Sequence, residues 1–415
     1  MNKKIIGIFL CMLLIATVLP ISSTMGNKEV KTIFKENILN GGWSKSFGGN
    51  GDDIGYCVKR TSDGGYIIVG ETNSFGSGDY DVWLIKTDAD GIDEWIKVHG
   101  GLDHDGGFSV QETKDGGYII GGYTFSYAVG EHDAWLLKTD SKGNEMWNMS
   151  YGGIGFDNGG IVFQTDDGGY IIQGLTDSFG AGGYDGWLIK TDENGTELWN
   201  KTYGGSGNEF TRDMAMTSDG GYILIGQKLS QGLFPKVVVW LIKIDVDGNV
   251  IWDKTYKGKF GHSFGTCAQP TSDDGYIITG QTKGFSLFGK WLGRGDIWLI
   301  KTDADGNKVW DKTFGRFIFE DICPYIIQTS DNGYLLAGLT DGLGSFITQL
   351  LWNPLISKAY LLKTDINGTK EWDEKLGKSA CVHVQETSDG GCITVGYTGN
   401  PNKPGDVFLV KRDTI

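Results

Sequence analysis

Proline is scarce in this chain, with 7 residues among 415, whereas glycine is abundant, with 67. The glycines follow no G-X-Y period, which excludes a collagen-like rod. Aromatic residues make up 12% of the chain, too many for a disordered linker. Many short strands joined by tight glycine turns account for both the glycine and the aromatic content.

Positive charge and cysteine are also in short supply. The 37 Lys and Arg stand against 52 Asp and Glu, a net charge of −15, so we expect no nucleic acid as a partner. Apart from Cys11, the five cysteines form an odd, sparse set without a C-x-x-C spacing, which excludes a disulfide framework and a zinc site. We expect buried thiols and no cofactor.

Long apolar runs are missing after the N-terminus. The one present, residues 5–19, follows Lys3 and Lys4 and precedes Pro20 and small polar residues. This pattern predicts a secretory signal peptide over residues 1–26, a linker over 27–40 and a single domain over 41–415. The run is short for a membrane span, so we expect cleavage and a secreted or cell-surface protein; an uncleaved anchor is the alternative.

A repeat with three markers occupies the rest of the chain. Asp-Gly-Gly-Tyr begins at Asp63, Asp115, Asp167 and Asp219, a 52-residue period, and degenerate copies begin at Asp273, Asp331 and Asp389. The second marker, Trp-Leu-Ile-Lys or a close variant, begins at Trp83, Trp135, Trp187, Trp240, Trp298, Tyr360 and Phe408. The third is a tryptophan after a turn: Trp43, Trp95, Trp147, Trp199, Trp252, Trp310 and Trp372. Seven copies predict seven structural units.

Each unit reads as four short strands. Asp-Gly-Gly supplies positive-φ residues for a tight hairpin, and the Trp-Leu-Ile-Lys strand is apolar on both faces, which indicates sheets stacked face to face. We therefore predict an all-β, seven-bladed β-propeller of four-stranded antiparallel blades. The chain begins with an unpaired Trp43 strand and ends without one, so we expect the N-terminal strand to complete the last blade and close the ring; an open solenoid is the alternative.

The spacing from turn glycine to tryptophan, as from Gly195 to Trp199 and from Gly306 to Trp310, resembles the quinoprotein-type (PQQ-like) propeller repeat, although the turn is one residue shorter. The chain is also similar to glycine-rich repeats of secreted prokaryotic propellers. The resemblance implies that the seven tryptophans of the third marker dock between adjacent blades. Replacing a docked, buried tryptophan with alanine is then expected to cost roughly 3–5 kcal/mol. The quinone and metal ligands of that family have no counterparts here.

Two acidic patterns contain carboxylates of the kind that bind metal ions. The Asp-x-Asp-Gly turns at Asp88, Asp245 and Asp303 look like calcium-loop fragments, but they lack further oxygen donors, so we expect hairpin turns and no metal. Ten residues before each Asp-Gly-Gly copy lies a second set: Asp53, Asp105, Asp157, Glu209 and Asp321, with Ser263 and Ser379 in the other two repeats. We expect these residues around one mouth of the channel, holding their own loops; the alternative is an acidic funnel for cations.

Two loops are longer than their counterparts and rich in aromatic side chains. We predict a ligand-binding patch there, made of Phe285, Phe288, Trp291, Phe346 and Trp352. The alternative is that the two loops pack on each other as a small cluster.

Catalytic signatures are lacking: the five histidines fall at non-equivalent repeat positions, and no nucleophile motif is present. We therefore expect a non-enzymatic binding or scaffold protein, monomeric, that recognises a protein or carbohydrate on its long-loop face. An extracellular carbohydrate-active hydrolase or lyase is the alternative.

Overall fold

The computed structural model describes residues 31–34, 42–230, 235–258, 261–283, 286–287, 290–291, 295–315, 320–342, 358–377, 379–398 and 405–415, with backbone only for 31–34, 283, 286–287, 290–291, 320 and 341–342. Every regular element in these ranges is a strand. None of them is therefore a helix long and apolar enough to cross a membrane.

Blades 1 to 4 repeat one pattern of four antiparallel strands. Blade 1 contains β3 (Asp53–Arg60), β4 (Tyr66–Thr72), β5 (Asp81–Thr87) and β6 (Asp93–His99). Blade 2 contains β7 (Asp105–Glu112), β8 (Tyr118–Thr124), β9 (Asp133–Thr139) and β10 (Glu145–Tyr151). Blade 3 contains β11 (Asp157–Gln164), β12 (Tyr170–Thr176), β13 (Asp185–Thr191) and β14 (Glu197–Tyr203). Blade 4 contains β15 (Phe210–Met216), β16 (Tyr222–Leu229), β17 (Val237–Ile244) and β18 (Val250–Tyr256).

Blades 5 to 7 follow the same order with additions. Blade 5 contains β19 (Ser263–Pro270), β20 (Tyr276–Lys283), β23 (Gly295–Thr302) and β24 (Lys308–Phe314), with a separate small hairpin of β21 (Ser286–Leu287) and β22 (Lys290–Trp291). Blade 6 contains β25 (Glu320–Gln328), β26 (Tyr334–Gly342), β27 (Lys358–Thr364) and β28 (Lys370–Lys375). Blade 7 contains β29 (Ser379–Glu386), β30 (Cys392–Thr398) and β31 (Val407–Arg412), joined by β1 (Lys31–Phe34) and β2 (Trp43–Gly48).

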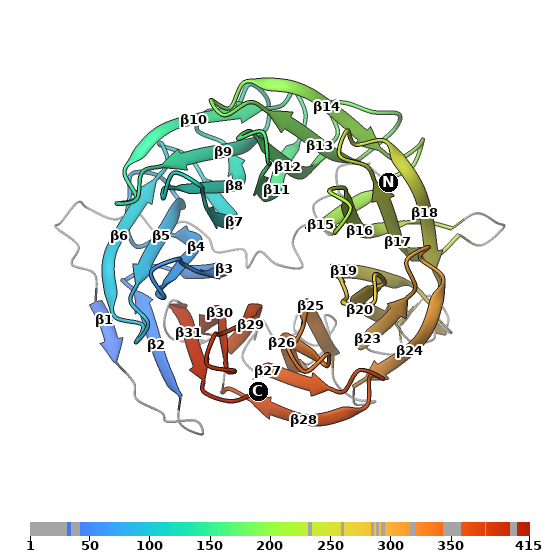
Figure 1. The fold of residues 1–415 in the computed structure, drawn as a ribbon. Helices are drawn as coiled ribbons and strands as arrows, with labels where there is room; N and C mark the ends of the chain where they lie inside the picture. The colour runs from blue at the N-terminus through green and yellow to red at the C-terminus, as the bar shows by residue number, and fades with distance from the viewer. Residues whose placement is uncertain are drawn as a thin grey trace.

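The seven sheets stand around a central axis, with the first strand of each blade innermost and, in blades 1 to 6, the tryptophan strand outermost (Figure 1). We call the space along this axis the channel. Strand β2 pairs antiparallel with β31, Ser44 opposite Val410, and so supplies the outer strand that the C-terminus lacks. The predicted β-propeller and its closure by the N-terminal strand are confirmed. The expected linker over residues 27–40 needs correction, because β1 lies within it and adds a fifth strand at the outer edge of blade 7.

The hydrophobic core lies between neighbouring blades. In β5, β9 and β13 every residue is buried, as expected for strands covered on both faces. Ile68 and Trp83 of blade 1 pack with Val395 and Leu409 of blade 7, across the closure of the ring. Each such apolar side chain contributes about 1.5–3 kcal/mol when it is removed from water. Packing between blades therefore contributes directly to the stability of the ring.

The Asp-Gly-Gly turn uses its two glycines for different reasons. Gly64 has a φ of 91°, and its counterparts in the degenerate copies are Asp274 and Asn332, with φ of 61° and 66°. Asn and Asp are the non-glycine residues that tolerate this left-handed region best. Gly65 has an ordinary φ, but a Cβ atom on it would lie 2.1 Å from the carbonyl oxygen of Thr87. The expectation of two positive-φ glycines is therefore corrected to one, the second being required by close packing.

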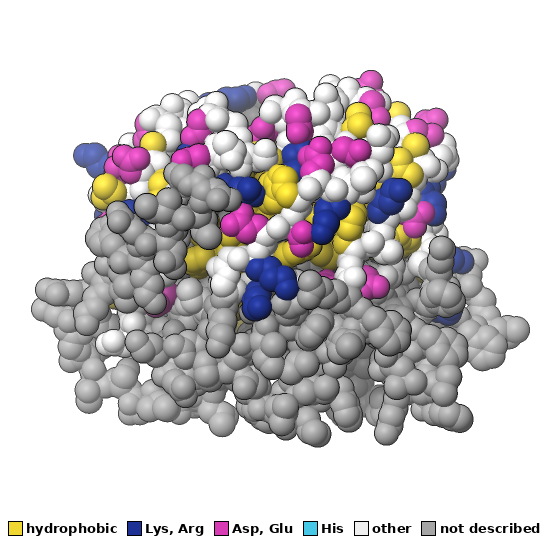
Figure 2. Space-filling view, turned by 90° about the horizontal axis from the view of Figure 1, so that it is seen from below, with side chains coloured by type: hydrophobic (Ala, Val, Ile, Leu, Met, Phe, Trp, Pro, Cys, Tyr) yellow, Lys and Arg dark blue, Asp and Glu magenta, His cyan; other side chains and the backbone are white. Residues whose placement is uncertain are grey.

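The ring has two unlike ends. Both tight turns of each blade, Asp-Gly-Gly and Asp-x-x-Gly, open onto one end, which we call the turn face. The connections within blades from β4 to β5 and between blades from β6 to β7, with their counterparts around the ring, open onto the other end, the loop face. The rim, seen from the side of β28, carries acidic and basic side chains interspersed over its described part (Figure 2). We therefore expect a functional surface at one of the two ends of the channel and not on the rim.

Candidate functional site

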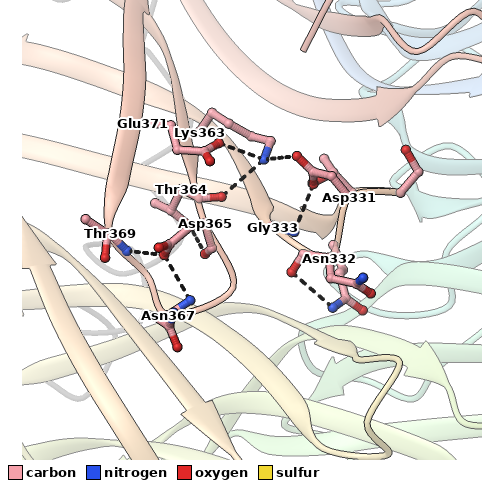
Figure 3. A network of polar contacts seen from close by, with 12 residues as sticks. Asp331, Asn332, Gly333, Lys363, Thr364, Asp365, Asn367, Thr369 and Glu371 are labelled. Carbon is pink, nitrogen blue, oxygen red and sulfur yellow. Dashed lines mark hydrogen bonds and ion pairs between the residues drawn. The ribbon is translucent and has the colours of Figure 1, made fainter.

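At the turn face, the lysine of each Trp-Leu-Ile-Lys strand forms an ion pair with the aspartate of the Asp-Gly-Gly turn. Lys363 Nζ lies 2.7 Å from Asp331 Oδ2, 3.1 Å from Glu371 Oε2 and 3.2 Å from the carbonyl oxygen of Thr364 (Figure 3). The other six pairs are Lys86–Asp63, Lys138–Asp115, Lys190–Asp167, Lys243–Asp219, Lys301–Asp273 and Lys411–Asp389. Seven identical pairs indicate a structural device of the repeat.

The sequence contained the signal for these pairs, since both residues recur in every repeat, but the two motifs were not connected. Partial burial raises the pKa of Asp331, but hydrogen bonds from Lys363, Thr329 and Gly333 outweigh it and lower the pKa to about 2. In Asp219 the hydrogen bond from Lys243 is the largest influence, and its pKa is also about 2. These carboxylates are therefore ionised at neutral pH, and the groups that hydrogen-bond to them belong to the turn and its neighbouring strand.

The Asp-x-Asp-Gly turns use their carboxylates in the same local way. Asp303 Oδ1 accepts hydrogen bonds from the backbone N–H groups of Asp305 and Asn307, at 3.1 and 2.8 Å. Asp88 accepts from Asp90 and Ile92 in the equivalent turn. This is the arrangement of an aspartate that stabilises its own turn.

The seven tryptophans of the third marker are half-buried on the outer strands. A Cβ atom on Gly248 would lie 2.9 Å from the ring of Trp199, and one on Gly306 would lie 2.8 Å from the ring of Trp252. Each of these glycines belongs to the hairpin turn of the next blade. Trp43 lies against Gly91 in the same way, across the closure of the ring. The tryptophans thus contact the neighbouring blade without being fully buried, which lowers the cost expected of their removal.

The channel-mouth acidic residues lie at the loop-face ends of the innermost strands. Asp53, Asp105 and Asp157 are fully buried, Asp321 is nearly so, and Glu209 is half-buried. Asp105 accepts hydrogen bonds from Gly101 N at 2.7 Å, Ser126 Oγ at 2.7 Å and Thr124 Oγ1 at 2.5 Å. The same three donors recur at Asp53 and Asp157. Each carboxylate therefore joins the loop before its strand to the loop after the next strand.

An unexpected feature lies at the same end, across blades 1 to 4. Seven aromatic rings form one connected series, which we call the aromatic arc: Tyr80, His104, Phe125, His132, Phe156, Tyr184 and Phe210. Successive ring centroids are 3.7–6.0 Å apart. Most of these rings are half-buried, and Phe125 is 41% exposed. The arc therefore presents aromatic surface next to the channel.

A buried carboxylate lies beneath the first part of the arc. Glu71 is 2% exposed and accepts hydrogen bonds from the hydroxyl groups of Tyr56 and Tyr123, at 2.8 and 3.0 Å. The Nε2 atom of His104 lies 2.7 Å from the Tyr123 hydroxyl and 3.5 Å from Glu71. Tyr56 occupies a β-bulge in β3, a feature that re-aims a side chain. Burial, followed by the Glu71 charge, raises the pKa of both tyrosines well above their usual value.

Sequence reasoning missed the arc, although the repeats contained a signal. Tyr80, His132 and Tyr184 each stand immediately before the aspartate that opens the third strand of blades 1, 2 and 3. The view that all five histidines occupy non-equivalent positions is wrong, because His104 and His262 both directly precede the first residue of an innermost strand. Only the fold brings these scattered rings into one series.

Further along the channel, the innermost strands carry unlike residues at one equivalent position: Cys57, Ser109, Ile161, Asp213, Cys267, Tyr325 and His383. Burial raises the pKa of Asp213 to about 6, and its effect outweighs that of the hydrogen bonds from the Cys267 thiol and the Ala268 N–H, which lower the pKa. The five cysteines after the N-terminal run are all buried and free, as expected.

The residues predicted as a ligand-binding patch lie outside the described side chains: Phe285, Phe288, Trp291, Phe346 and Trp352. In the sequence they fall between β20 and β23 and between β26 and β27, and the described ends of these strands lie at the loop face.

Comparison with known proteins supports the fold and gives little beyond it. No family model matches the chain. The regulatory protein FlaEY of Caulobacter vibrioides is 23% identical over 199 residues, which cover 41% of this chain and 21% of FlaEY. The chain thus spans about a fifth of that relative.

Solved structures provide the clearer likeness. Puromycin hydrolase superposes with a TM-score of 0.51 at 13% identity, over 85% of this chain and 51% of the hydrolase. The WD40 domain of Pan2 from Neurospora crassa gives a TM-score of 0.51 at 8% identity, over 87% of this chain and 89% of the domain. At such identities the likeness is one of fold: the chain is a seven-bladed β-propeller.

Proposed function

We propose that this protein is an exported or cell-surface binding module, without enzymatic activity, that takes up carbohydrate on its loop face. The aromatic arc carries the proposal. Ligand sites combine apolar and aromatic walls with a few fixed polar groups, and aromatic rings present an apolar face suited to the C–H surface of a sugar ring. Rings of the arc are partly exposed beside a polar cluster of Glu71, Tyr123 and His104.

Two further features support the same face. The described strands that flank Trp291 and Trp352 in the sequence, in blades 5 and 6, also end at this face. Export rests on the apolar N-terminal run, which lies outside the described residues. The PQQ-like type of the repeat is part of the same proposal, because the sequence resemblance to that repeat agrees with an exported propeller.

The test is a glycan array probed with the mature chain and single variants. We expect Phe156→Ala and Tyr184→Ala to weaken binding by roughly tenfold or more, because each removes a buried aromatic contact of about 1–3 kcal/mol. Met146→Ala is the matched control: its side chain is exposed on the outer strand β10, and binding should be unchanged. Trp291→Ala and Trp352→Ala test the long loops.

Two outcomes would contradict the proposal. If the arc variants bind every glycan as the wild type does, the arc is not the binding surface. If the bound oligosaccharide is shortened on incubation, as seen by mass spectrometry, the protein is a carbohydrate-active hydrolase or lyase, and the Glu71 cluster becomes the place to look for its acid.

A further inference from the structure

The buried acids of the loop face come in pairs that cross the blade junctions. Asp81, which opens the third strand of blade 1, is 1% exposed, and Asp105, which opens the first strand of blade 2, is fully buried. A Cβ atom on Gly100 would lie 2.0 Å from Asp81 Oδ1 and 2.9 Å from Asp105 Oδ2. The two carboxylates therefore approach each other beside Gly100, where the absence of a side chain leaves room for both.

The same pair recurs at five of the seven junctions: Asp81 with Asp105, Asp133 with Asp157, Asp185 with Glu209, Asp296 with Asp321, and Asp406 with Asp53. At the remaining two junctions the acids are lost together. The equivalent positions hold Val238 and Ser263 at one of them, and Lys358 and Ser379 at the other. Like charges repel each other, so independent acids have no reason to be kept or lost as pairs. A ligand or proton bound by both carboxylates explains why they are present or absent together.

The structure provides a second observation, independent of the pairing. Asp81 Oδ1, Asp133 Oδ1 and Asp185 Oδ1 are buried and make no hydrogen bond, although the other oxygen of each group accepts backbone N–H groups. These oxygens lie beside Gly100, Gly152 and Gly204, and so point at the partner acid. A buried carboxylate oxygen without a partner is costly, yet the repeat has kept it three times.

From this geometry we propose that the inter-blade carboxylate pairs are calcium sites. Calcium is a hard cation that takes oxygen ligands at about 2.3–2.6 Å, which suits two carboxylates that lie next to each other. Among the described residues no group of three or more His, Cys, Asp or Glu side chains is placed to hold a metal, so each ion takes two carboxylates and completes its shell with neutral oxygens. Sites with so few charges have dissociation constants on the order of 10⁻⁴–10⁻³ M, typical of extracellular modules.

The positions of glycine and lysine at the junctions are consistent with a bound cation. All five paired junctions have glycine at the equivalent position, Gly48, Gly100, Gly152, Gly204 and Gly315, and at the first four of these a Cβ atom would lie close to both acids. At one unpaired junction Lys257 replaces this glycine, and at the other Lys358 replaces the aspartate, so a lysine stands where a pair is missing. Burial, with the partner carboxylate contributing, raises the pKa of Asp81 and of Asp133. A proton shared by the two carboxylates is the competing explanation, and calcium binding by the wild type would exclude it.

The experiment compares the mature chain in EDTA and in millimolar calcium, by calorimetric calcium titration and by thermal unfolding. We expect more than one calcium ion to bind and the Tm to rise by about 5 °C or more. Magnesium should give a smaller shift, because it demands octahedral geometry and keeps its water. The double variant Asp81→Asn, Asp133→Asn should bind fewer ions and lose part of the Tm rise. Asp90→Asn, in an exposed turn, is the matched control and should keep the whole response.

The asparagine variants are expected to fold in EDTA with a Tm at or above that of the wild type, because they remove one of two like charges and preserve the shape of the side chain. The wild-type titration decides the matter even if they do not fold. A protein that binds no calcium and melts at the same temperature with and without it would overturn the proposal. If the wild type shows no calcium response and the Asp81→Asn, Asp133→Asn variant loses part of the stabilisation by mild acid in EDTA, the pairs share a proton instead. Neither result bears on glycan binding, which the array tests separately.

Discussion

At the scale of single residues, the buried lysine of the Trp-Leu-Ile-Lys strand is the least expected feature. A lysine inside a fully buried strand is costly unless its charge is paired. The fold provides that partner from the tight turn, together with the carbonyl oxygen of the next residue. The second turn glycine belongs to the same device, because a Cβ atom on Gly333 would lie 2.3 Å from Lys363 Nζ. The motif Asp-Gly-Gly and the lysine are thus one structural unit.

We predict that Lys363→Met destabilises the protein by about 2 kcal/mol. The lysine is 1% exposed, but Asp331 is 57% exposed, so water partly compensates the carboxylate that is left behind. Lys370→Met is the matched control: its pair with Asp373 is exposed and should be worth no more than about 0.5 kcal/mol. Urea unfolding of the two variants measures both values. Equal losses would show that the buried pairs do not stabilise the repeat.

At the scale of strands, the two kinds of tryptophan separate. Those of the third strands, such as Trp187, are fully buried within the interface between blades, whereas those of the outer strands, such as Trp199, lie half-buried against the glycine turn of the next blade. From the sequence, the tryptophans of the outer strands were predicted to be the buried ones. Their strand has a partner on one side only, so one edge of each ring stays in contact with water.

We therefore expect Trp199→Ala to cost about 2 kcal/mol and Trp187→Ala about 4 kcal/mol of unfolding free energy. Both residues belong to blade 3, so the comparison holds the blade constant. Chemical unfolding followed by circular dichroism gives the two values. A larger loss for Trp199→Ala would mean that contact between blades at the rim dominates the stability of the ring.

At the scale of the whole molecule, the acids fall into two groups with opposite pKa shifts. Six turn aspartates, one each in blades 1–4, 6 and 7, have a pKa of about 2. Since their unfolded pKa is about 3.9, they stabilise the fold above pH 4 and lose that contribution as the pH falls toward 2. Burial raises the pKa of Asp53 and Asp213 to about 6, so these two destabilise the fold at neutral pH and cease to do so when protonated.

In calcium-free buffer, stability should therefore rise as the pH falls from about 7 to about 5 and then drop steeply below about 4. The Tm measured across this range checks both limbs. A Tm that increases steadily from acid to neutral pH would show that the buried acids of the loop face and channel do not carry raised pKa values in solution.

The repeat alone determined the architecture. Seven copies of three markers, the third strand that is apolar on both faces, and a Trp43 strand at the start with none after the last repeat were enough for seven blades and a closed ring, because these properties depend on local pattern and on counting. Tertiary structure decided everything that joins positions far apart in sequence: Lys86 with Asp63, the rings from Tyr80 to Phe210, and Asp81 with Asp105 across a junction. The glycines illustrate both contributions, that of the sequence and that of the tertiary structure. Their abundance predicted turns, but only the packed ring revealed that Gly65 makes room for a neighbouring carbonyl and Gly100 for two facing carboxylates.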